Sequence, residues 1–393
     1  MKRVVVGLSG GVDSSVAAHL LLEAGYEVIA MFMKNWHDES VTKSDECPWI
    51  DDSNDALLVA QHLGIPFQVI DLSKEYKNRI VDYMFSEYEQ GRTPNPDVLC
   101  NKEIKFDVFL QAALELGAEF VATGHYCQKI QNSDGTYSLK AGRDTNKDQS
   151  YFLCQINQEQ LTKALFPIGH LEKTKVREIA KKAGLITASK KDSQGLCFVG
   201  KISLPIFLQQ KLAVKKGLII EIDETHEQIL QYHTLLKTEE NPALLTKPYT
   251  FKKEDGKVVG EHIGAHFYTI GQRKGLNVGG RPFPSFVISI DIENNIVYTG
   301  QKESHLGLHR KYLKLTKESM NLLNEQTENQ NIKPRKYLFR IRYRQALQAG
   351  TLLVHEKDYY IKFEKLQKGV TPGQFAAWYD NDLHLIGSAV IEH

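Results

Sequence analysis

A glycine loop near the start of the chain constrains the fold more than any other feature. Val4-Val5-Val6 is a β-branched run that ends at Gly7, and the loop Ser9-Gly10-Gly11-Val12-Asp13-Ser14 follows it. Apolar residues then recur at helical spacing up to Gly25, a residue type that commonly ends helices. Glycines let a backbone approach a phosphate closely, and the N–H groups at a helix start attract anions. The loop therefore predicts a phosphate-binding turn between a strand and a helix.

Two other phosphate-binding motifs do not fit this loop. A Walker A loop needs a lysine before its final Ser or Thr, and none stands there; the dinucleotide pattern GxGxxG is also absent. Ser14 offers a hydroxyl donor, while the Asp13 carboxylate suits Mg²⁺ better than it suits a phosphate. A plain strand-to-helix turn is the alternative, but SGGxDS after an all-β-branched strand is far more specific than such a turn requires.

Strands and helices alternate through the first part of the chain. After the first pair we expect a strand at Val28–Phe32, a helix at Asp55–Leu63, a buried strand at Phe67–Leu72, a helix at Phe106–Leu116 and a strand at Phe120–Thr123. This α/β alternation predicts a doubly wound parallel sheet with helices on both faces. Such sheets bind ligands at the carboxyl ends of their strands, where the glycine loop, Met33 and Gly124 all stand.

The chain of 393 residues is too long for one ordinary core, so we expect three domains. Residues 1–204 form the α/β catalytic domain, and residues 205–281 a small central domain with an insertion near 222–260. Residues 282–393 carry short alternating runs, such as Phe286–Ile290, that predict a small C-terminal β-barrel. Within it, Lys317–Asn331 is polar and predicts a long surface loop.

Composition limits the compartment and the kind of partner. Lys and Arg number 49 against 48 Asp and Glu, so a nucleic acid must be held by local patches and not by an overall basic field. The apolar start meets glycine too early for a signal peptide, and no run reaches the roughly 18 apolar residues of a membrane span. The 5 cysteines are scattered without zinc spacing. We therefore expect a cytoplasmic protein with reduced thiols, no membrane association and no metal site built by the protein.

Basic residues gather mainly in residues 333–345, which contain no acidic residue. If 337–345 is a strand, Arg340, Arg342 and Arg344 share one face and present guanidinium groups to phosphates. A solvated barrel face is the alternative. The weaker patches are His305-Leu306 with His309-Arg310-Lys311, and Gln272-Arg273-Lys274-Gly275.

Several motifs, taken in order, resemble those of a known family. SGGVDS is similar to the PP-loop of ATP pyrophosphatases. The further motifs are Phe32–Trp36, Gly91–Asn101, Ala122–Tyr126, Asn146–Phe152, Asp192–Phe198, Tyr268–Gly275, Arg342–Gln345 and Thr371–Gln374. Together they resemble the bacterial tRNA-specific 2-thiouridylases, from about residue 3 to 200 and again in the later segments.

The resemblance implies a tRNA 2-thiouridine synthase, an ATP-dependent tRNA sulfurtransferase. ATP with Mg²⁺ would adenylate the 2-carbonyl oxygen of the wobble uridine, and sulfur from a cysteine persulfide would then give 2-thiouridine, AMP and pyrophosphate. Mg²⁺ would accompany ATP, in contact with Asp13. The implied partners are tRNA and a persulfide donor, such as a cysteine desulfurase or a relay protein.

The resemblance also assigns the two cysteines that lie in family motifs. Cys197 would carry the persulfide, Cys100 would act as the nucleophile that resolves it, and the two would form a transient disulfide. Asp97 would serve as a general acid or base. Without the motifs, a single cysteine is more often a small buried apolar residue, an interpretation that we keep for Cys127 and Cys154. Lys190-Lys191 should lower the pKa of Cys197.

The remaining site residues fall into three groups. Expected at ATP are Gly7, Leu8, Ser9, Gly10, Gly11, Val12, Asp13, Ser14, Met33 and Gly124. Expected at the target base are Asn95, Pro96 and Asp97, on a loop stiffened by two prolines. Expected at tRNA are His125, Lys147, Asp148, Gln149, His305, Leu306 and Gln345. Met33 as a core residue and His125 as a structural histidine are the alternatives.

Two other functions fit parts of the sequence. One is an ATP pyrophosphatase that forms a C–N bond on a small molecule and needs no cysteine pair. The other is a non-catalytic RNA-binding or sulfur-carrier protein. The intact glycine loop and the loop cysteines Cys100 and Cys197 disfavour both.

Overall fold

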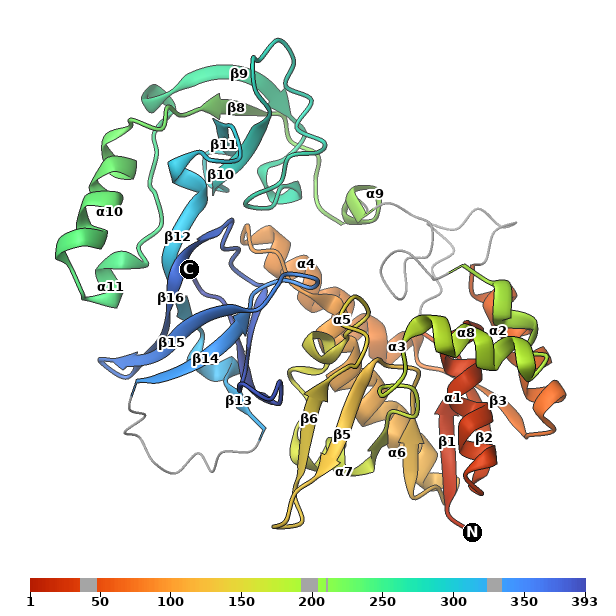
Figure 1. Cartoon of the computed structure of the whole chain (residues 1–393). Helices are drawn as coiled ribbons and strands as arrows, with labels where there is room; N and C mark the ends of the chain where they lie inside the picture. Colours follow the sequence, from red (N-terminus) through yellow and green to blue (C-terminus); the bar gives the residue numbers. More distant parts are fainter. Residues whose placement is uncertain (36–47, 192–203, 210, 324–333) are drawn as a thin grey trace.

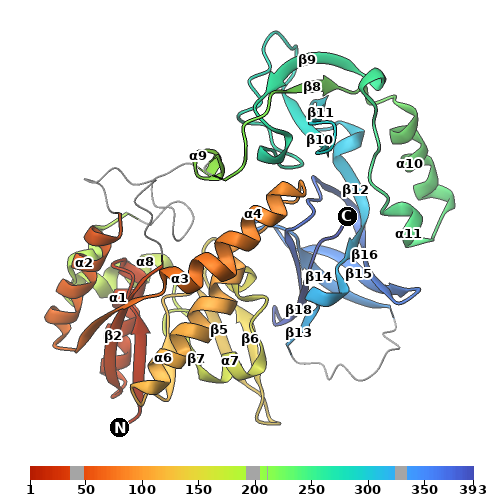
Figure 2. The same ribbon diagram turned by 180° about the vertical axis from the view of Figure 1, so that it is seen from behind.

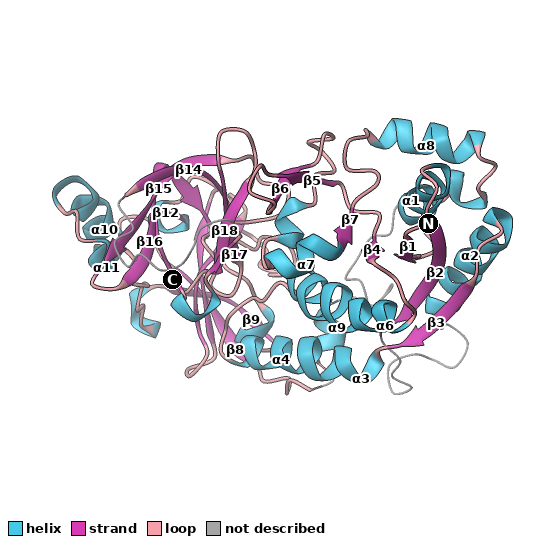
Figure 3. Ribbon diagram, turned by 90° about the horizontal axis from the view of Figure 1, so that it is seen from below, coloured by secondary structure: helices cyan, strands magenta, loops and turns pink. Residues whose placement is uncertain are grey.

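The computed structural model describes residues 1–35, 48–191, 204–209, 211–323 and 334–393. They form three units, which follow one another along the chain (Figure 1). Cys47 and Cys197 lie outside the described residues. Seen from below, the first sheet and the last sheet stand at opposite ends of the molecule (Figure 3).

The first unit is built on a five-stranded sheet of order β3-β2-β1-β4-β7. Every neighbouring pair in it is parallel, which confirms the expected doubly wound sheet. Its strands are β1 (Arg3–Gly7), β2 (Glu27–Lys34), β3 (Phe67–Asp71), β4 (Phe120–Ala122) and β7 (Ala164–Leu165). A separate antiparallel hairpin consists of β5 (Cys127–Gln131) and β6 (Tyr137–Ala141).

Alternation along β1 explains how the sheet is covered on both faces. Val4 and Val6 point to one side, where they pack with α1 (Val12–Glu23), α2 (Pro48–Leu63) and α8 (Lys173–Lys182). Val5 points to the other side, among the residues of the helices between β3 and β4. These helices are α3 (Ser73–Tyr76), η1 (Lys77–Val81), α4 (Asp82–Glu89), α5 (Pro96–Leu99), η2 (Cys100–Val108) and α6 (Phe109–Glu115). The view from behind shows α6 in front of the sheet, and α4 running from it toward the central and C-terminal units (Figure 2).

Two expectations for this unit need correction. The apolar run Phe67–Leu72 was expected to be a buried strand, but β3 is the sheet edge, and Val69 is 50% exposed. The helix expected at Phe106–Leu116 is preceded by a helical segment from Cys100, η2, which is kinked at Phe106 (φ −104°, ψ 15°) before the chain enters α6. The unit is completed by η3 (Ser150–Leu153), α7 (Gln158–Lys163), η4 (Ile186–Ser189) and α9 (Leu204–Leu208).

The central unit contains a four-stranded sheet of order β10-β11-β8-β9. Its elements are β8 (Gly217–Glu221), α10 (Glu227–Thr238), α11 (Pro242–Leu245), η5 (Lys253–Asp255), β9 (Lys257–His262), η6 (Ala265–Phe267), β10 (Ser285–Asp291), β11 (Ile296–Gln301) and η7 (Leu306–Leu308). The expected boundary at 281/282 therefore precedes two strands of this sheet. β11 pairs with β8, so the unit extends to Gln301, and the run at 286–290 does not belong to the barrel. The expected insertion contains α10 and α11, whose Ile229, Tyr232 and Leu245 pack in the core of this unit.

The C-terminal unit is a seven-stranded sheet of order β12-β16-β15-β14-β17-β18-β13. Its elements are β12 (His309–Leu315), η8 (Lys317–Ser319), β13 (Asn321–Leu322), β14 (Arg335–Arg340), β15 (Gln348–His355), β16 (Asp358–Lys368), β17 (Phe375–Tyr379) and β18 (Leu385–Val390). A bridge between Leu315 and Ile391 joins the first strand to the end of β18, so the sheet closes into the expected barrel. The polar segment expected as a loop at 317–331 includes η8 and β13, and residues 324–333 lie outside the described part.

The barrel packs against the first unit through a continuous joint. Phe375 and Tyr379 of β17 share a core cluster with Cys100 and Phe109 of the first unit. Tyr151 Oη donates a hydrogen bond to the Phe375 carbonyl, at 3.0 Å. Segments of the first unit and of the barrel that are far apart in the sequence are therefore held side by side next to Cys100. None of the described helices is both long and apolar enough to cross a bilayer.

Candidate active site

The glycine loop lies at the carboxyl end of β1, in the middle of the parallel sheet. Gly10 has φ +71°, and a Cβ there would overlap the Asp52 carbonyl oxygen, so only glycine fits. The Ser14 hydroxyl accepts a hydrogen bond from the Ser9 N–H, at 3.1 Å, and closes the loop on itself. Gly11 is the N-cap of α1 and has no side chain to cap the first turn, which leaves the helix start suited to an anion.

Neighbouring strand ends bring other expected ATP residues to this loop. A Cβ on Gly124 would stand 2.7 Å from the Ser14 nitrogen, so the chain after β4 touches the loop backbone. A Cβ on Gly7 would stand 3.1 Å from the Met33 methyl carbon, which places the end of β2 beside the end of β1. The structure thus gathers Gly7, Ser14, Met33 and Gly124 at the carboxyl ends of β1, β2 and β4, with Ser14 in the first turn of α1.

A lysine that the sequence analysis did not single out lies at the loop. Lys173 Nζ is 2.8 Å from both carboxylate oxygens of Asp13, and its side chain is only 11% exposed. The Tyr126 hydroxyl donates to the same carboxylate, at 2.6 Å. Asp13 in this arrangement does not fit the expected magnesium ligand, because an ammonium group already occupies both oxygens. No local pattern could reveal a partner 160 positions away.

Cys100 begins the π-helix η2, directly after α5. Its side chain is fully buried, and burial raises the pKa of the Cys100 thiol to about 11. The Asp97 carboxylate raises this pKa further, while Lys105 and a hydrogen bond with Tyr76 lower it. A π-helix is rare and often marks a functional segment. The thiol is protonated and shielded in this conformation, so it must be uncovered before it can react.

Lys105 is a second residue that the sequence did not indicate. Its charge acts on both the Cys100 thiol and the His125 ring, lowering the pKa of each. Both Lys105 and Cys100 lie on the helical segment that precedes the kink at Phe106, so the lysine charge stands near the thiol.

The loop at residues 90–95 connects α4 to α5, and α5 leads to Cys100. Asn95 caps α5 by accepting a hydrogen bond from the Val98 N–H, at 3.4 Å, and Pro96 occupies the first helical position. Asp97 lies in the first turn of this helix. Local sequence therefore accounts for the short helix that carries the expected base-contacting residues toward the thiol.

The residues expected at tRNA in segment 146–149 lie at the joint with the barrel. Asp148 is 4% exposed: one oxygen accepts the Gly142 and Ser150 N–H groups, and the other meets Arg340 Nη1 at 2.8 Å. Gln149 Oε1 accepts the Tyr126 N–H, at 3.0 Å, while Lys147 is half-buried. The Asp148 carboxylate is thus committed to the protein, and it cannot meet RNA in this arrangement.

His125 lies close to η2. Its ring is 8% exposed and faces Phe106 and Phe166, and Nδ1 lies 2.7 Å from the Thr123 hydroxyl. Burial lowers the pKa of His125 well below its ordinary value, so the ring is neutral. This environment is that of the structural histidine considered as the alternative, and contact with tRNA remains a prediction.

The sequence predicted a strand at 337–345 with three arginines on one exposed face, and this prediction is wrong. β14 ends at Arg340, which is buried and paired with Asp148. Arg342 donates to the Lys368 and Gly369 carbonyls, and burial lowers its pKa. Arg344 alone of the three is exposed, at a turn with φ +63°. Gln345 turns inward, where its amide accepts the Ile341 N–H and donates to Gln367.

The weaker patch at 305–306 is also used within the protein. His305 is 3% exposed, with Nδ1 accepting the Gly307 N–H and Nε2 lying 3.2 Å from the Ile222 carbonyl. The Leu306 carbonyl lies 3.1 Å from His233 Nε2. Both His305 nitrogens therefore hold the turn between the central unit and β12, which leaves them no contact to offer RNA here.

Lys190 has two partners that the sequence did not indicate. Its ammonium pairs with Asp52 at 2.7 Å and Asp55 at 2.5 Å, both on α2. Its charge is therefore shared with α2, near the glycine loop, and its effect on the pKa of Cys197 stays a prediction. Lys191 is exposed, and Cys197 itself lies outside the described residues.

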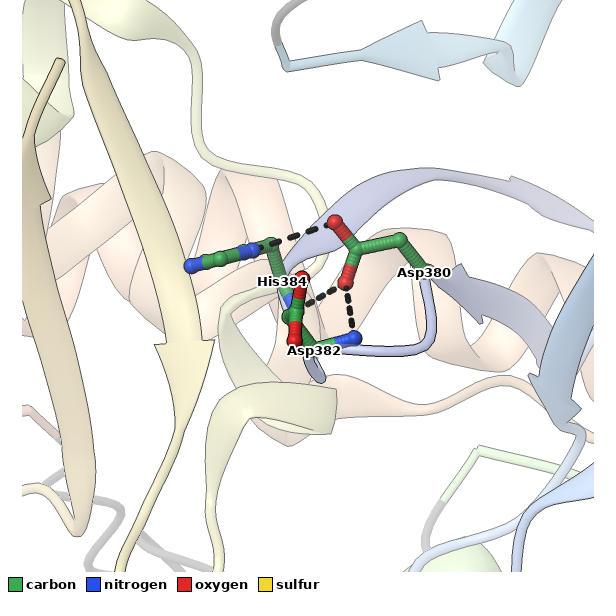
Figure 4. A group of neighbouring side chains, drawn as sticks. All are labelled: Asp380, Asp382 and His384. Carbon is green, nitrogen blue, oxygen red and sulfur yellow. Dashed lines mark hydrogen bonds and ion pairs between the residues drawn. The ribbon is translucent and has the colours of Figure 1, made fainter.

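Within the described ranges, one group of three residues of types that can bind a metal, Asp380, Asp382 and His384, lies at the turn between β17 and β18 (Figure 4). Asp380 accepts the N–H groups of Asp382 and His384, and its second oxygen lies 3.1 Å from His384 Nδ1. The turn also bridges to β6, through Lys140 and His384. These contacts show a hydrogen-bonded turn that supports the joint between the first unit and the barrel.

The fold and site define a PP-loop α/β enzyme domain that carries two β domains. Family models match each unit: "tRNA methyl transferase HUP domain" over residues 2–201, "tRNA methyl transferase PRC-barrel domain" over 243–301 and "Aminomethyltransferase beta-barrel domain" over 313–391. Proteins named tRNA-specific 2-thiouridylase MnmA from Christiangramia forsetii and Flavobacterium johnsoniae are 57% and 58% identical, with all of both chains aligned. The chain belongs to the tRNA-specific 2-thiouridylase (MnmA) family.

A solved structure of a 4-thiouridine synthetase–RNA complex with bound ATP is more distant. It is 21% identical, covers 53% of this chain and 49% of its own, and has a TM-score of 0.31. A similarity of that size carries no argument about function.

Proposed function

We propose that this protein is a tRNA 2-thiouridine synthase, which transfers sulfur to the wobble uridine at the expense of ATP. The observation that carries the proposal is the identity of 57–58% to named tRNA-specific 2-thiouridylases over the whole of each chain. The glycine loop and the cysteine-bearing segment η2 support it, since they provide a phosphate turn and a thiol within one domain.

The first step is adenylation. The ATP phosphates lie at the glycine loop and the start of α1, with Mg²⁺ as the usual companion of the triphosphate. The uridine 2-carbonyl oxygen attacks the α-phosphate, pyrophosphate leaves, and the oxygen becomes a good leaving group as AMP. Lys173 turns from Asp13 to the phosphates and stabilises their charge.

The second step transfers sulfur. The terminal sulfur of a persulfide on Cys197 attacks C2 of the activated base, and AMP leaves with the C–O bond electrons. The Cys100 thiolate then attacks the Cys197 sulfur, and the S–S bond electrons pass to the sulfur on the base. The products are 2-thiouridine and a Cys100–Cys197 disulfide, which an external thiol reductant returns to two thiols. In a direct route, Cys100 attacks the persulfide first and releases hydrosulfide, which then attacks C2.

The partners follow from this chemistry. A persulfide donor, such as a cysteine desulfurase or a relay protein, loads Cys197, and a tRNA with a wobble uridine is the acceptor. Reduced thiols suit a cytoplasmic enzyme. Asn95, Pro96 and Asp97 face the target base, Asp97 as general acid or base, and the exposed Arg344 offers a phosphate contact near the joint.

Mass spectrometry of tRNA incubated with the protein, ATP and a persulfide donor tests the proposal. We expect 2-thiouridine from the unsubstituted protein, none from Cys100→Ser or Cys197→Ser, and unchanged ATP binding in both variants. Cys127→Ala is the matched control, because Cys127 is a buried thiol on the β5–β6 hairpin. Full turnover by either serine variant would overturn the cysteine assignment. ATP cleavage without any sulfur product would favour a C–N-forming enzyme.

A further inference from the structure

The barrel reaches into the first unit and holds the backbone of the loop at residues 93–95. Gln374, directly before β17, donates from Nε2 to the Thr93 carbonyl at 2.8 Å and to the Pro94 carbonyl at 3.2 Å. Its Oε1 lies 3.5 Å from Asn95 Nδ2. One amide side chain of the barrel therefore contacts three successive residues of the loop.

The backbone before Gln374 strengthens this contact. The Thr93 N–H donates to the Pro372 carbonyl, at 2.9 Å, so the two segments also bond main chain to main chain. Gly373 has φ +89°, and a Cβ there would stand 2.9–3.0 Å from the Thr93 backbone. Only glycine permits both this conformation and this approach.

The central unit adds a third side to the same loop. The hydroxyl groups of Thr93 and Thr269 lie 3.0 Å apart, and the Thr371 hydroxyl donates to the Ile270 carbonyl at 3.3 Å. All three units thus meet at Thr93.

From this loop, a rigid path leads to the reacting groups. The Asn95 side chain caps α5, α5 carries Asp97 in its first turn, and Cys100 begins the next helix. Tyr151, which bonds to the Phe375 carbonyl, also hydrogen-bonds with Asn95. A change in the position of residues 93–95 therefore moves Asp97 and Cys100 with them.

We propose that Gln374 is a positioning residue for the reaction: by holding the Thr93 and Pro94 carbonyls, it sets the place of Asp97 and Cys100 relative to the bound nucleotide and base. The inference rests on the proposed function. It gives the barrel a part in the chemical step, separate from any contact with tRNA.

Matched variants test this role. Gln374→Met keeps the length of the side chain and removes its hydrogen bonds. Gln155→Met is the control, because Gln155 also crosses from the first unit to the C-terminal unit, donating to Ser388 Oγ at 2.7 Å and to the Ser319 carbonyl at 3.1 Å. Gln155 is buried and makes these contacts away from the loop at 93–95. Both variants lose the side-chain amide hydrogen bonds between the first unit and the C-terminal unit. Only Gln374→Met loses the hydrogen bonds to the loop at 93–95.

Steady-state formation of 2-thiouridine with a persulfide donor gives the first readout. We expect Gln374→Met to lower kcat roughly 10- to 100-fold, with KM for tRNA changed by less than about twofold, because misplaced groups slow chemistry more than binding. We expect Gln155→Met to keep kcat within about twofold, whatever its loss of thermal stability. Equal kcat values for the two variants would overturn the positioning role.

A pH profile of Gln374→Glu gives the second readout, and it decides the matter if Gln374→Met does not fold. A glutamate there faces two carbonyl acceptors, which disfavour its charged form. Its protonated form donates to one of them, so the ratio of variant to unsubstituted kcat should rise as the pH falls from about 8 to about 6. A ratio independent of pH would contradict the proposal. Absence of 2-thiouridine from the unsubstituted protein would instead overturn the proposed function, and the positioning role with it.

Discussion

At the scale of single residues, Lys173 places a cation at the phosphate loop. Its ammonium lies 2.8 Å from Asp13 at the start of α1, whereas a Walker A motif carries its lysine within the loop itself. Asp13 thus holds the lysine ready at the loop. The ATP phosphates compete with the Asp13 carboxylate for the Lys173 ammonium. Because the ammonium exchanges one anionic partner for another, the electrostatic cost of the exchange is small.

We expect Lys173→Met to weaken ATP binding by roughly 10- to 100-fold, since a hydrogen bond to a charged group contributes about 1.5–3 kcal/mol. Isothermal titration calorimetry with ATP and Mg²⁺ measures the change. Lys175→Met is the control, because Lys175 lies on the same helix and pairs with Glu178 at the surface. An ATP dissociation constant equal to that of the unsubstituted protein would show that Lys173 serves only Asp13.

Residue roles were predictable where the signal is local. The residues that define the loop at 9–14 and the cap Asn95-Pro96 lie within a few positions of one another. In the structure, the loop precedes α1, and Asn95 caps α5 with Pro96 at its first position. The partners of Asp13 and Asp148 lie 160 and 192 positions away, so no spacing indicates Lys173 or Arg340. Asp148 was expected at the surface in contact with tRNA, but in the fold it is buried and paired with Arg340.

At the scale of elements, the π-helix η2 keeps Cys100 unreactive. The thiol is fully buried, and its pKa of about 11 lies above the ordinary value of 9.0. At pH 8, such a thiol has about 100-fold less thiolate than an unperturbed one. A shift of η2, or of the loop before it, is needed to expose Cys100 when substrate arrives.

Alkylation by iodoacetamide, followed by peptide mass spectrometry, tests this state. In the free protein we expect the Cys100 rate at pH 8 to be at least about 100-fold below that of the same thiol unfolded in guanidinium. The rate should rise about tenfold per pH unit until pH 11, because the thiolate is the reacting form. Addition of ATP and tRNA should accelerate the reaction. A fast, pH-independent rate in the free protein would contradict the buried state.

Element boundaries show where sequence patterns were insufficient. The apolar run at Phe67–Asp71 has the composition of a central strand, yet it stands at the sheet edge, because strand order depends on distant pairings. The alternation after Tyr337 suggested a long strand, but the backbone leaves the sheet after Arg340 and Arg344 takes a positive φ. The strands β10 and β11 were assigned to the barrel for the same reason: their partner β8 lies far earlier in the chain.

At the scale of the whole molecule, the joint between the first unit and the barrel depends on a buried ion pair. The side chains of Arg340 and Asp148 are 11% and 3% exposed, and Nη1 lies 2.8 Å from Oδ2. Asp148 also holds the Gly142 and Ser150 N–H groups, so it organises the segment that meets β17. Loss of either charge would leave the other buried without a partner.

We expect Arg340→Met to destabilise the joint by about 3–5 kcal/mol, the usual cost of an unpaired buried charge. Urea denaturation followed by near-ultraviolet circular dichroism measures it, with Asp148→Asn in the Arg340→Met background expected to recover part of the loss. Arg344→Met, exposed on the following turn, should change stability by no more than about 0.5 kcal/mol. Equal midpoints for the two arginine variants would show that the pair contributes little.

The contact between Thr93 and Gln374 spans 281 positions of the chain. During synthesis, a ribosome completes the segment with Asn95, Asp97 and Cys100 long before it reaches the codon for Gln374. A message cut short before that codon therefore encodes a polypeptide with every reactive group of the first unit, but with residues 93–95 lacking their hold from the barrel. Such a nascent chain carries the thiol and the phosphate loop before it has the means to align them.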